Sequence, residues 1–260
     1  MKKIRTNILS AAQAQAFEEL AGLCRVHDGI SLSCPLDADR FYLLAEETPD
    51  GGLLLISAAA VFEEDGLWEC YGFTRPDSRR RGYFSSLLLP LEKDAAAMEP
   101  EPDLCFVADP SGKDALKALA ALGTQPWYEE HAMEWRAEKS GAVRPAPPAG
   151  ELPSLDLTGA PDSADSRRLN FIARTPGGQA VGSFSLYLTP PSACLFEVEI
   201  AEPLRRRGLG EAMLRKLQSL TPDLGLNSLT LQVSGENLPA LGLYEKTGFR
   251  IAETLSYYLY

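Results

Sequence analysis

Residues 195–220 read LFEVEIAEPLRRRGLGEAMLRKLQSL, and this stretch decides the fold. Over 195–200 apolar and acidic residues alternate, which predicts a β-strand. Over 209–220 apolar side chains recur at the spacing of one helix face. Three arginines followed by glycine lie between the two segments. The stretch therefore predicts a strand, a basic glycine-containing loop and a helix in direct succession.

This loop has the features of a phosphate site. The first turn of a helix leaves backbone N–H groups unpaired and carries partial positive charge, so it attracts an anion. Gly208 and Gly210 allow an anion to approach the backbone, and arginine side chains form charge-assisted bonds to phosphate. Two alternatives are a solvated basic helix start and a dinucleotide-binding loop. The second lacks its third glycine, and Thr230 stands where its acidic residue is expected.

Further strands and a second helix are predicted on both sides of this stretch. Strands are expected at 169–173, 180–188, 195–200, 229–233 and 251–260, the last of them closing the sheet. A helix is expected at 238–247, where Gly248 ends it.

The same order of elements occurs earlier in the chain, where residues 79–82 again read Arg-Arg-Arg-Gly. Strands are expected at 40–46, 52–62, 67–74, 104–108 and 127–135. Helices are expected at 11–26, from Phe84 onward and at 113–122. A repeated order of elements indicates a tandem arrangement.

Composition marks the boundary between the two repeats. Five prolines lie between residues 140 and 166, a stretch with little apolar periodicity. We therefore predict a first domain at 1–140, a proline-rich linker at 141–164 with one strand near Leu155, and a second domain at 165–260. A chain of 260 residues is long enough for two ordinary domains.

The second repeat resembles the GNAT superfamily of acyl-CoA-dependent N-acetyltransferases. The resemblance is carried by Arg205-x-x-Gly208-x-Gly210, by Asn237 with Tyr244 seven residues later, and by Gly248-Phe249. It implies an α/β fold, a mixed and strongly twisted sheet flanked by helices, here in two tandem GNAT-like domains. It also implies that the parallel strands at 195–200 and 229–233 splay apart to admit the pantetheine arm of coenzyme A.

The resemblance further implies acetyl-CoA as the acyl donor and assigns residues to it. The expected cofactor-binding residues are Ile200, Ala201, Glu202, Arg205, Arg206, Arg207, Gly208, Leu209, Gly210, Asn237 and Tyr244.

Acyl transfer to an amine needs a proton for the departing thiolate and a base for the amine. Tyr244 is expected to donate the proton, because a phenol is a competent acid toward a thiolate. Glu197 and Glu199 are candidates for the base, since both should project from one face of a central strand and lose solvent there. The alternatives are that Tyr244 only packs and that this strand face is wet.

The first repeat fits the family less well. Phe84 stands where the last glycine of the loop belongs, and Pro90 is expected to interrupt the following helix. Leu119 takes the place of Tyr244. We therefore expect one working cofactor site, in the second repeat.

Composition limits the partners. A formal charge of −11 disfavours nucleic acid and anionic membranes. Five cysteines without C-x-x-C spacing and two histidines do not predict a metal site. No apolar run is long enough for a membrane helix or a signal peptide, so we expect a cytoplasmic protein.

The sequence thus predicts an N-acyltransferase that uses acetyl-CoA and acts on a primary amine of a small molecule or peptide. It does not identify the acceptor. The alternative is a non-catalytic acyl-CoA-binding or scaffold module.

Overall fold

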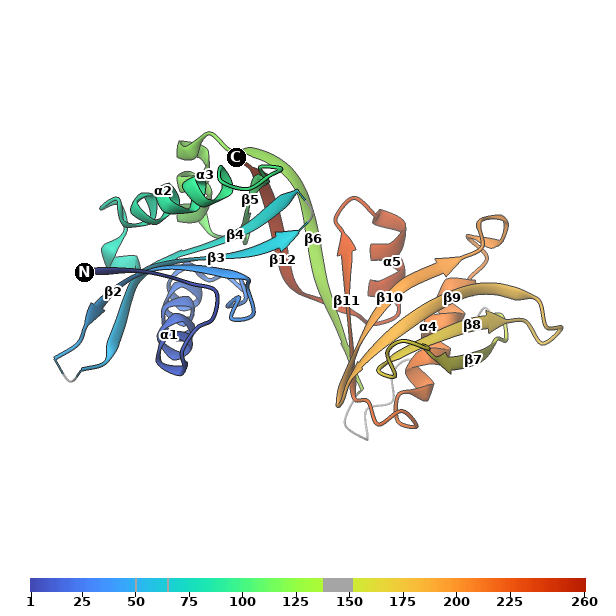
Figure 1. Cartoon of the computed structure of the whole chain (residues 1–260). Coiled ribbons are helices and arrows are strands. Elements are labelled where there is room, and N and C mark those ends of the chain that lie inside the picture. The colour runs from blue at the N-terminus through green and yellow to red at the C-terminus, as the bar shows by residue number, and fades with distance from the viewer. Residues whose placement is uncertain (50, 65, 138–151) are drawn as a thin grey trace. The chain divides into compact units, whose positions relative to one another are not determined.

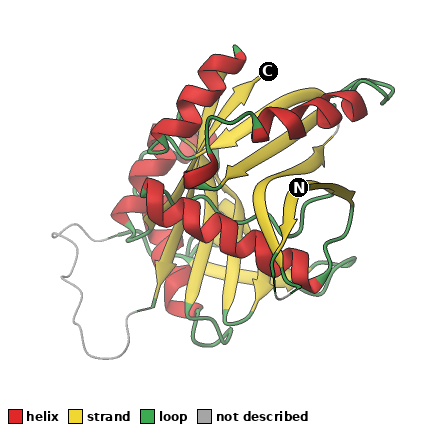
Figure 2. Cartoon of the chain, turned by 90° about the vertical axis from the view of Figure 1, so that its left-hand side faces the viewer, coloured by secondary structure: helices red, strands yellow, loops and turns green. Residues whose placement is uncertain are grey.

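The computed structural model describes residues 1–49, 51–64, 66–137 and 152–260 (Figure 1). The chain divides into two compact units, which we call unit 1 (Met1–Glu129 with Glu253–Tyr260) and unit 2 (Glu130–Ala252). Both contain strands flanked by helices, so the predicted α/β fold is confirmed (Figure 2).

Unit 1 is built on a mixed sheet with helices on both faces. Its strands follow the order β1 (Lys2–Thr6), β2 (Arg40–Glu47), β3 (Leu53–Glu64), β4 (Leu67–Thr74), β5 (Asp103–Ala108) and β12 (Arg250–Leu259). Its helices are α1 (Ala11–Asp28), α2 (Tyr83–Ala95) and α3 (Lys113–Leu122). Phe17 of α1 packs edge-on against Phe41 and Phe73, whereas Leu91 of α2 shares a second core with Trp68. Because alternate residues of β2 enter the two cores, α1 and α2 cover opposite faces of the sheet.

Helix α2 corrects one expectation. The sequence predicts an interruption at Pro90, and this prediction is wrong, because α2 continues through it to Ala95. Proline lacks the N–H that would bond the carbonyl four residues earlier, which is that of Ser86. Lys3 Nζ donates to Ser86 O at 2.8 Å instead. A side chain of β1, a strand that the sequence does not predict, thus replaces the missing helix bond.

Unit 2 has a sheet with one large apolar core. Its strands follow the order β6 (Gln125–Arg136), β11 (Ser228–Ser234), β10 (Ser192–Ile200), β9 (Ala180–Thr189), β8 (Arg168–Arg174) and β7 (Asp156–Pro161). Its helices are α4 (Leu209–Leu220) and α5 (Leu238–Lys246). Largely apolar residues from the strands and helices meet in the core, among them Phe184, Met213, Leu217, Leu231 and Phe249. β7 lies within the stretch predicted as a linker, of which 141–151 lie outside the described residues.

The last strand of each repeat pairs outside its own repeat. β12 pairs antiparallel with β5 of unit 1, with Ser256 opposite Ala108, instead of closing the sheet of the second repeat. β6 pairs antiparallel with β11 of unit 2, from Ser228 opposite Arg136 to Ser234 opposite Glu130. Alternation along a strand decides which face is buried but not which strand lies beside it. The sequence pattern therefore predicts both strands but not this exchange.

Candidate active site

The candidate site of unit 2 begins where two parallel strands part. β10 and β11 pair from Ser192 opposite Ser228 to Cys194 opposite Thr230. Beyond Cys194, β10 continues its pairing with β9 on the other side up to Ile200. The predicted splaying of the two parallel strands is therefore confirmed, and backbone groups of β10 become available to a ligand between them.

A β-bulge shapes the end of β10. The register with β9 shifts between Phe196 and Glu199, and Glu197 has a φ of 54°. Gly182 of β9 makes this possible, because a Cβ at that position would lie 2.4 Å from Glu199 O. The backbone of the two strands can approach this closely only at a glycine.

The arginine loop follows the bulge. Arg205 Nε donates to Ile200 O at 3.0 Å, which ties the loop to the strand end. Arg206 and Gly208 both adopt left-handed backbone conformations, with φ of 64° and 77°. Gly210 lies against α5, because a Cβ there would be 3.0 Å from Leu243 Cδ2. The loop therefore places the start of α4 beside the end of β10.

Three of the backbone groups expected to bind the cofactor already have partners. Ala201 N donates to Val181 O at 3.0 Å, and Ile200 O accepts the bond from Arg205. Leu204 N bonds Ala201 O at 2.8 Å, within the short turn Glu202–Leu204. A ligand must therefore use the groups of β10 that face the gap toward β11.

Tyr244 is presented by α5. Asn237 caps this helix by accepting a bond from Ala240 N at 3.2 Å. The ring of Tyr244 is buried and packs edge-on against Phe249 at 5.7 Å. Burial raises the pKa of Tyr244 above its ordinary value of 10.0, which keeps the phenol protonated. Within the described residues the hydroxyl makes no hydrogen bond, so it is available as a donor.

The two glutamates of β10 differ in their surroundings. Both are exposed, so the loss of solvent expected for them is not observed; the bulge replaces the regular strand on which that expectation rests. Glu197 Oε2 accepts bonds from Arg168 Nη2 at 2.7 Å and from Ser185 Oγ at 2.9 Å. Glu199 has no such bond among the described side chains. The carboxylate of Glu199 is thus the one of the two without a described hydrogen-bond partner.

Unit 1 contains a matching loop. β4 and β5 pair in parallel from Leu67 opposite Asp103 to Tyr71 opposite Val107 and then part. Arg79 Nε donates to Thr74 O at 3.1 Å, just as Arg205 bonds Ile200. The φ angles of Arg80 and Gly82 are 63° and 76°, within 1° of those of Arg206 and Gly208. The two loops therefore share one backbone geometry.

The side chains around the loop of unit 1 differ from those of unit 2. A cavity of about 830 Å³ lies beside it, and Leu119 lines this cavity from α3. Phe84 lies against Gly72 so closely that a Cβ on Gly72 would be 2.6 Å from its ring. The ring also contacts Phe106 edge-on at 6.1 Å. An aromatic side chain thus occupies the position that corresponds to Gly210.

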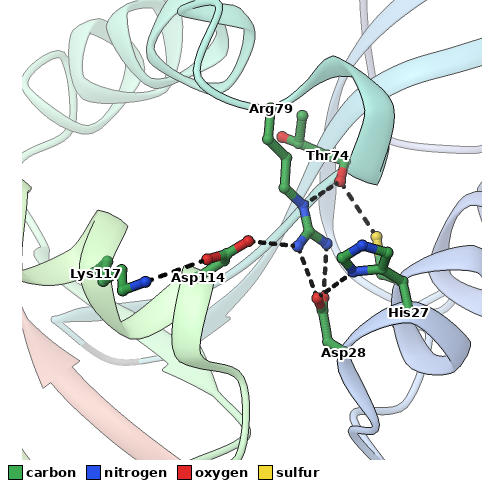
Figure 3. A network of polar contacts seen from close by, with 7 residues as sticks. His27, Asp28, Thr74, Arg79, Asp114 and Lys117 are labelled. Carbon is green, nitrogen blue, oxygen red and sulfur yellow. Dashed lines mark hydrogen bonds and ion pairs between the residues drawn. The ribbon is translucent and has the colours of Figure 1, made fainter.

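The guanidinium of Arg79 is engaged by carboxylates (Figure 3). Its two Nη atoms donate to Asp28 at 2.7 and 2.6 Å, and Nη1 also reaches Asp114 at 3.3 Å. Bonding to Arg79 holds the pKa of Asp28 below its usual value, and Asp28 in turn raises the pKa of Arg79. His27 Nδ1 lies 2.8 Å from Asp28. Sequence reasoning misses this network, whose members come from α1, α3 and the loop.

Across residues 1–49, 51–64, 66–137 and 152–260, no cluster of three or more histidine, cysteine, aspartate or glutamate side chains is arranged to hold a metal ion. Nor does any helix within them have the length and apolar character needed to cross a membrane.

Known proteins share this architecture. The acetyltransferase (GNAT) family model matches residues 124–249. Mycothiol acetyltransferase of Clavibacter sepedonicus is 26% identical over 269 residues, which cover 90% of this chain and 87% of that protein. A GCN5-related N-acetyltransferase from Sphaerobacter thermophilus superposes with a TM-score of 0.73 at 19% identity, covering 99% of this chain and 95% of that one.

A tandem GNAT protein from the clavulanic acid biosynthesis pathway matches 100% of this chain and 98% of its own, with a TM-score of 0.61 and 14% identity. The family match to residues 124–249, the relatives and the shared fold together support a place for this chain in the GNAT superfamily of acetyltransferases. Its fold is that of the tandem-domain members, so the resemblance seen in the motifs is confirmed.

Proposed function

We propose that unit 2 transfers an acetyl group from acetyl-CoA to the primary amine of a small molecule. This location is supported mainly by the contrast between Arg79 and Arg205, which occupy equivalent positions in two loops of the same backbone geometry. Arg79 is neutralised by Asp28 and Asp114, whereas Arg205 bonds only the backbone of Ile200 in the described structure. A guanidinium without a carboxylate partner is the one that attracts a phosphate group.

The donor would bind along the loop and the gap between β10 and β11. The start of α4 offers unpaired N–H groups for the pyrophosphate, next to Gly208 and Gly210. Arg205, Arg206 and Arg207 supply positive charge. The strand end near Ile200 supplies backbone groups for the pantetheine amides.

Protons would move at two side chains. Tyr244 is protonated and its hydroxyl is not engaged by a described group, so it is the proposed donor to the leaving thiolate. Glu199 is the proposed base, acting directly or through a water, because Glu197 is already held by Arg168 and Ser185. The reaction forms an amide bond, breaks the thioester and releases CoA as a thiol.

A small-molecule acceptor is supported by a relative. The C. sepedonicus protein, which aligns over 90% of this chain, is named for mycothiol and not for a protein substrate. The negative charge of −11 also favours a cationic acceptor over an anionic one.

The location is tested by a pair of variants and a binding measurement. Gly210→Asp puts a carboxylate against the proposed pyrophosphate, so acetyl-CoA affinity measured by calorimetry should fall at least 100-fold, roughly the cost of an uncompensated charge. Arg81→Glu changes the charge at the loop of unit 1 and serves as the control, with unchanged affinity expected. Loss of affinity in Arg81→Glu with normal binding in Gly210→Asp would place the donor in unit 1 instead.

Activity is tested by release of the CoA thiol in the presence of a panel of amines. Release above the rate of hydrolysis supports the transferase. Binding of acetyl-CoA with no release for any amine would favour the alternative of a non-catalytic binding module.

A further inference from the structure

A buried carboxylate links the phosphate loop to the helix that bears Tyr244. Glu211 follows Gly210 in the first turn of α4 and is only 4% exposed. Its Oε1 bonds Arg215 at 2.9 Å, and its Oε2 bonds Lys246 Nζ at 2.6 Å. Arg215 lies on α4 itself, whereas Lys246 is the last residue of α5. The carboxylate therefore spans the two helices.

Two further hydrogen bonds join α4 to the C-terminal end of α5. Arg215 Nη2 donates to Lys246 O at 3.3 Å, and Gln218 Nε2 donates to Thr247 O at 2.8 Å. Both acceptors lie within three residues of Tyr244. Gly210 lies against Leu243, the residue that precedes Tyr244 in α5. The position of the Tyr244 hydroxyl relative to the loop thus depends on this set of contacts.

Glu211 is charged in this setting. Burial alone would raise the pKa of Glu211, but Lys246 and Arg215 outweigh burial and the pKa is lowered. An ionised carboxylate next to a phosphate site opposes the binding of an anion unless cations neutralise it. Lys246 of α5 therefore neutralises the Glu211 carboxylate, and the same contact holds α5 against α4.

We propose that Glu211 is a positioning residue that holds the Tyr244 hydroxyl in line with the departing thiolate of a donor whose pyrophosphate is bound at the loop. The inference rests on the proposed function of unit 2. Misplacement of a reacting group by about 1 Å costs on the order of 100-fold in rate. Removing the contact should therefore lower kcat while the loop itself still binds acetyl-CoA.

The test is a double-mutant cycle on kcat. Tyr244→Phe alone should lower kcat by about 100-fold to 10,000-fold, the usual range for a general acid. Glu211→Ala alone should lower kcat by about 10-fold to 100-fold, with acetyl-CoA affinity changed by less than about 3-fold. In the Tyr244→Phe background, Glu211→Ala should lower kcat no further, because there is no hydroxyl left to position.

Controls separate positioning from a general loss of structure. Glu211→Gln keeps the side-chain length but only one acceptor oxygen, which can serve Arg215 or Lys246 but not both, so it should restore part of the kcat that Glu211→Ala loses. Leu217→Ala removes core packing from α4 and should act independently of Tyr244→Phe, so that the two effects multiply. If Glu211→Ala does not fold, Lys246→Ala removes the same link from an exposed side chain and takes its place in the cycle.

The outcomes are distinguishable. Wild-type protein without turnover on any amine refutes the proposed function and this inference with it. Turnover in wild type with kcat unchanged in Glu211→Ala, or with effects that multiply with Tyr244→Phe, refutes the positioning role alone. A Tyr244→Phe variant with normal kcat also refutes it, because no acid is then being positioned.

Discussion

Gly182 is the residue at which a single added methyl group should disturb the site most. A Cβ at Gly182 would lie 2.4 Å from Glu199 O and 2.7 Å from Ile200 Cδ1. Because close C···O contacts in sheets are about 3.3 Å, Gly182→Ala requires a movement of about 0.9 Å between the backbones of β9 and β10. Overpacking of this kind costs about 1–3 kcal/mol. The strand end that opens toward β11 would be displaced with it.

Chemical denaturation and calorimetry measure the two consequences of Gly182→Ala. The free energy of unfolding should fall by about 1–3 kcal/mol, and acetyl-CoA affinity should fall because the Ile200 backbone moves. Gly242→Ala is the matched control: it lies in α5 with no neighbour within 4 Å of its Cβ, and alanine should stabilise this helix by about 0.5–1 kcal/mol. A Gly182→Ala variant with wild-type stability and affinity would refute the role assigned to the bulge.

Two further predictions concern carboxylates. Glu199→Gln should lower kcat while acetyl-CoA affinity is kept, and Glu197→Gln should have the smaller effect; steady-state kinetics of both variants check this, and the reverse order would make Glu197 the base. Asp28→Asn should lower the free energy of unfolding at pH 7 by about 2 kcal/mol, since the bond from Arg79 to a charged acceptor is lost. Folding lowers the pKa of Asp28, so the stabilisation that Asp28 provides is complete above the ordinary pKa of 3.8 and is lost as the pH falls below it. The free energies of unfolding of wild type and Asp28→Asn should therefore converge when denaturation is repeated at falling pH. A difference that persists at acid pH would contradict the ion pair.

The elements with local signals were predicted well. β4 and α3 begin and end where the sequence places them, at Leu67–Thr74 and Lys113–Leu122. Gly123, which ends α3, has a φ of 80°, the left-handed conformation that glycine adopts at helix ends. β1 lacked such a signal, because the segment Lys2–Thr6 is rich in charge and contains a single apolar residue, Ile4. The sequence therefore predicts elements where a few neighbouring residues determine them.

The site was predictable to the same extent. The loop, the parting of β10 and β11 and the placement of Tyr244 on a helix follow from motifs within about 50 residues of one another. The bulge did not follow, because a regular alternation of Glu197 and Glu199 with apolar residues is also the pattern of an unbroken strand. The pairing of Glu211 with Arg215 is a helix contact at four-residue spacing, but its bond to Lys246 spans 35 positions and leaves no local trace.

The two arginine loops show why the motif alone does not define a binding site. Arg80 and Arg206 both adopt a left-handed backbone that is unfavourable for a residue with a side chain, so the Arg-Arg-Arg-Gly sequence produces the same loop twice. What differs is the partner of the first arginine, and that partner is remote: Asp28 lies 51 positions before Arg79, at the end of α1. The second repeat has no described helix ahead of its first strand, and no described carboxylate is paired with Arg205. An arginine that already holds a bidentate carboxylate must give up those bonds before it can bind phosphate, whereas Arg205 has none to give up. A preceding helix, described only in the first repeat, thus changes the charge of an Arg-Arg-Arg-Gly loop that both repeats share.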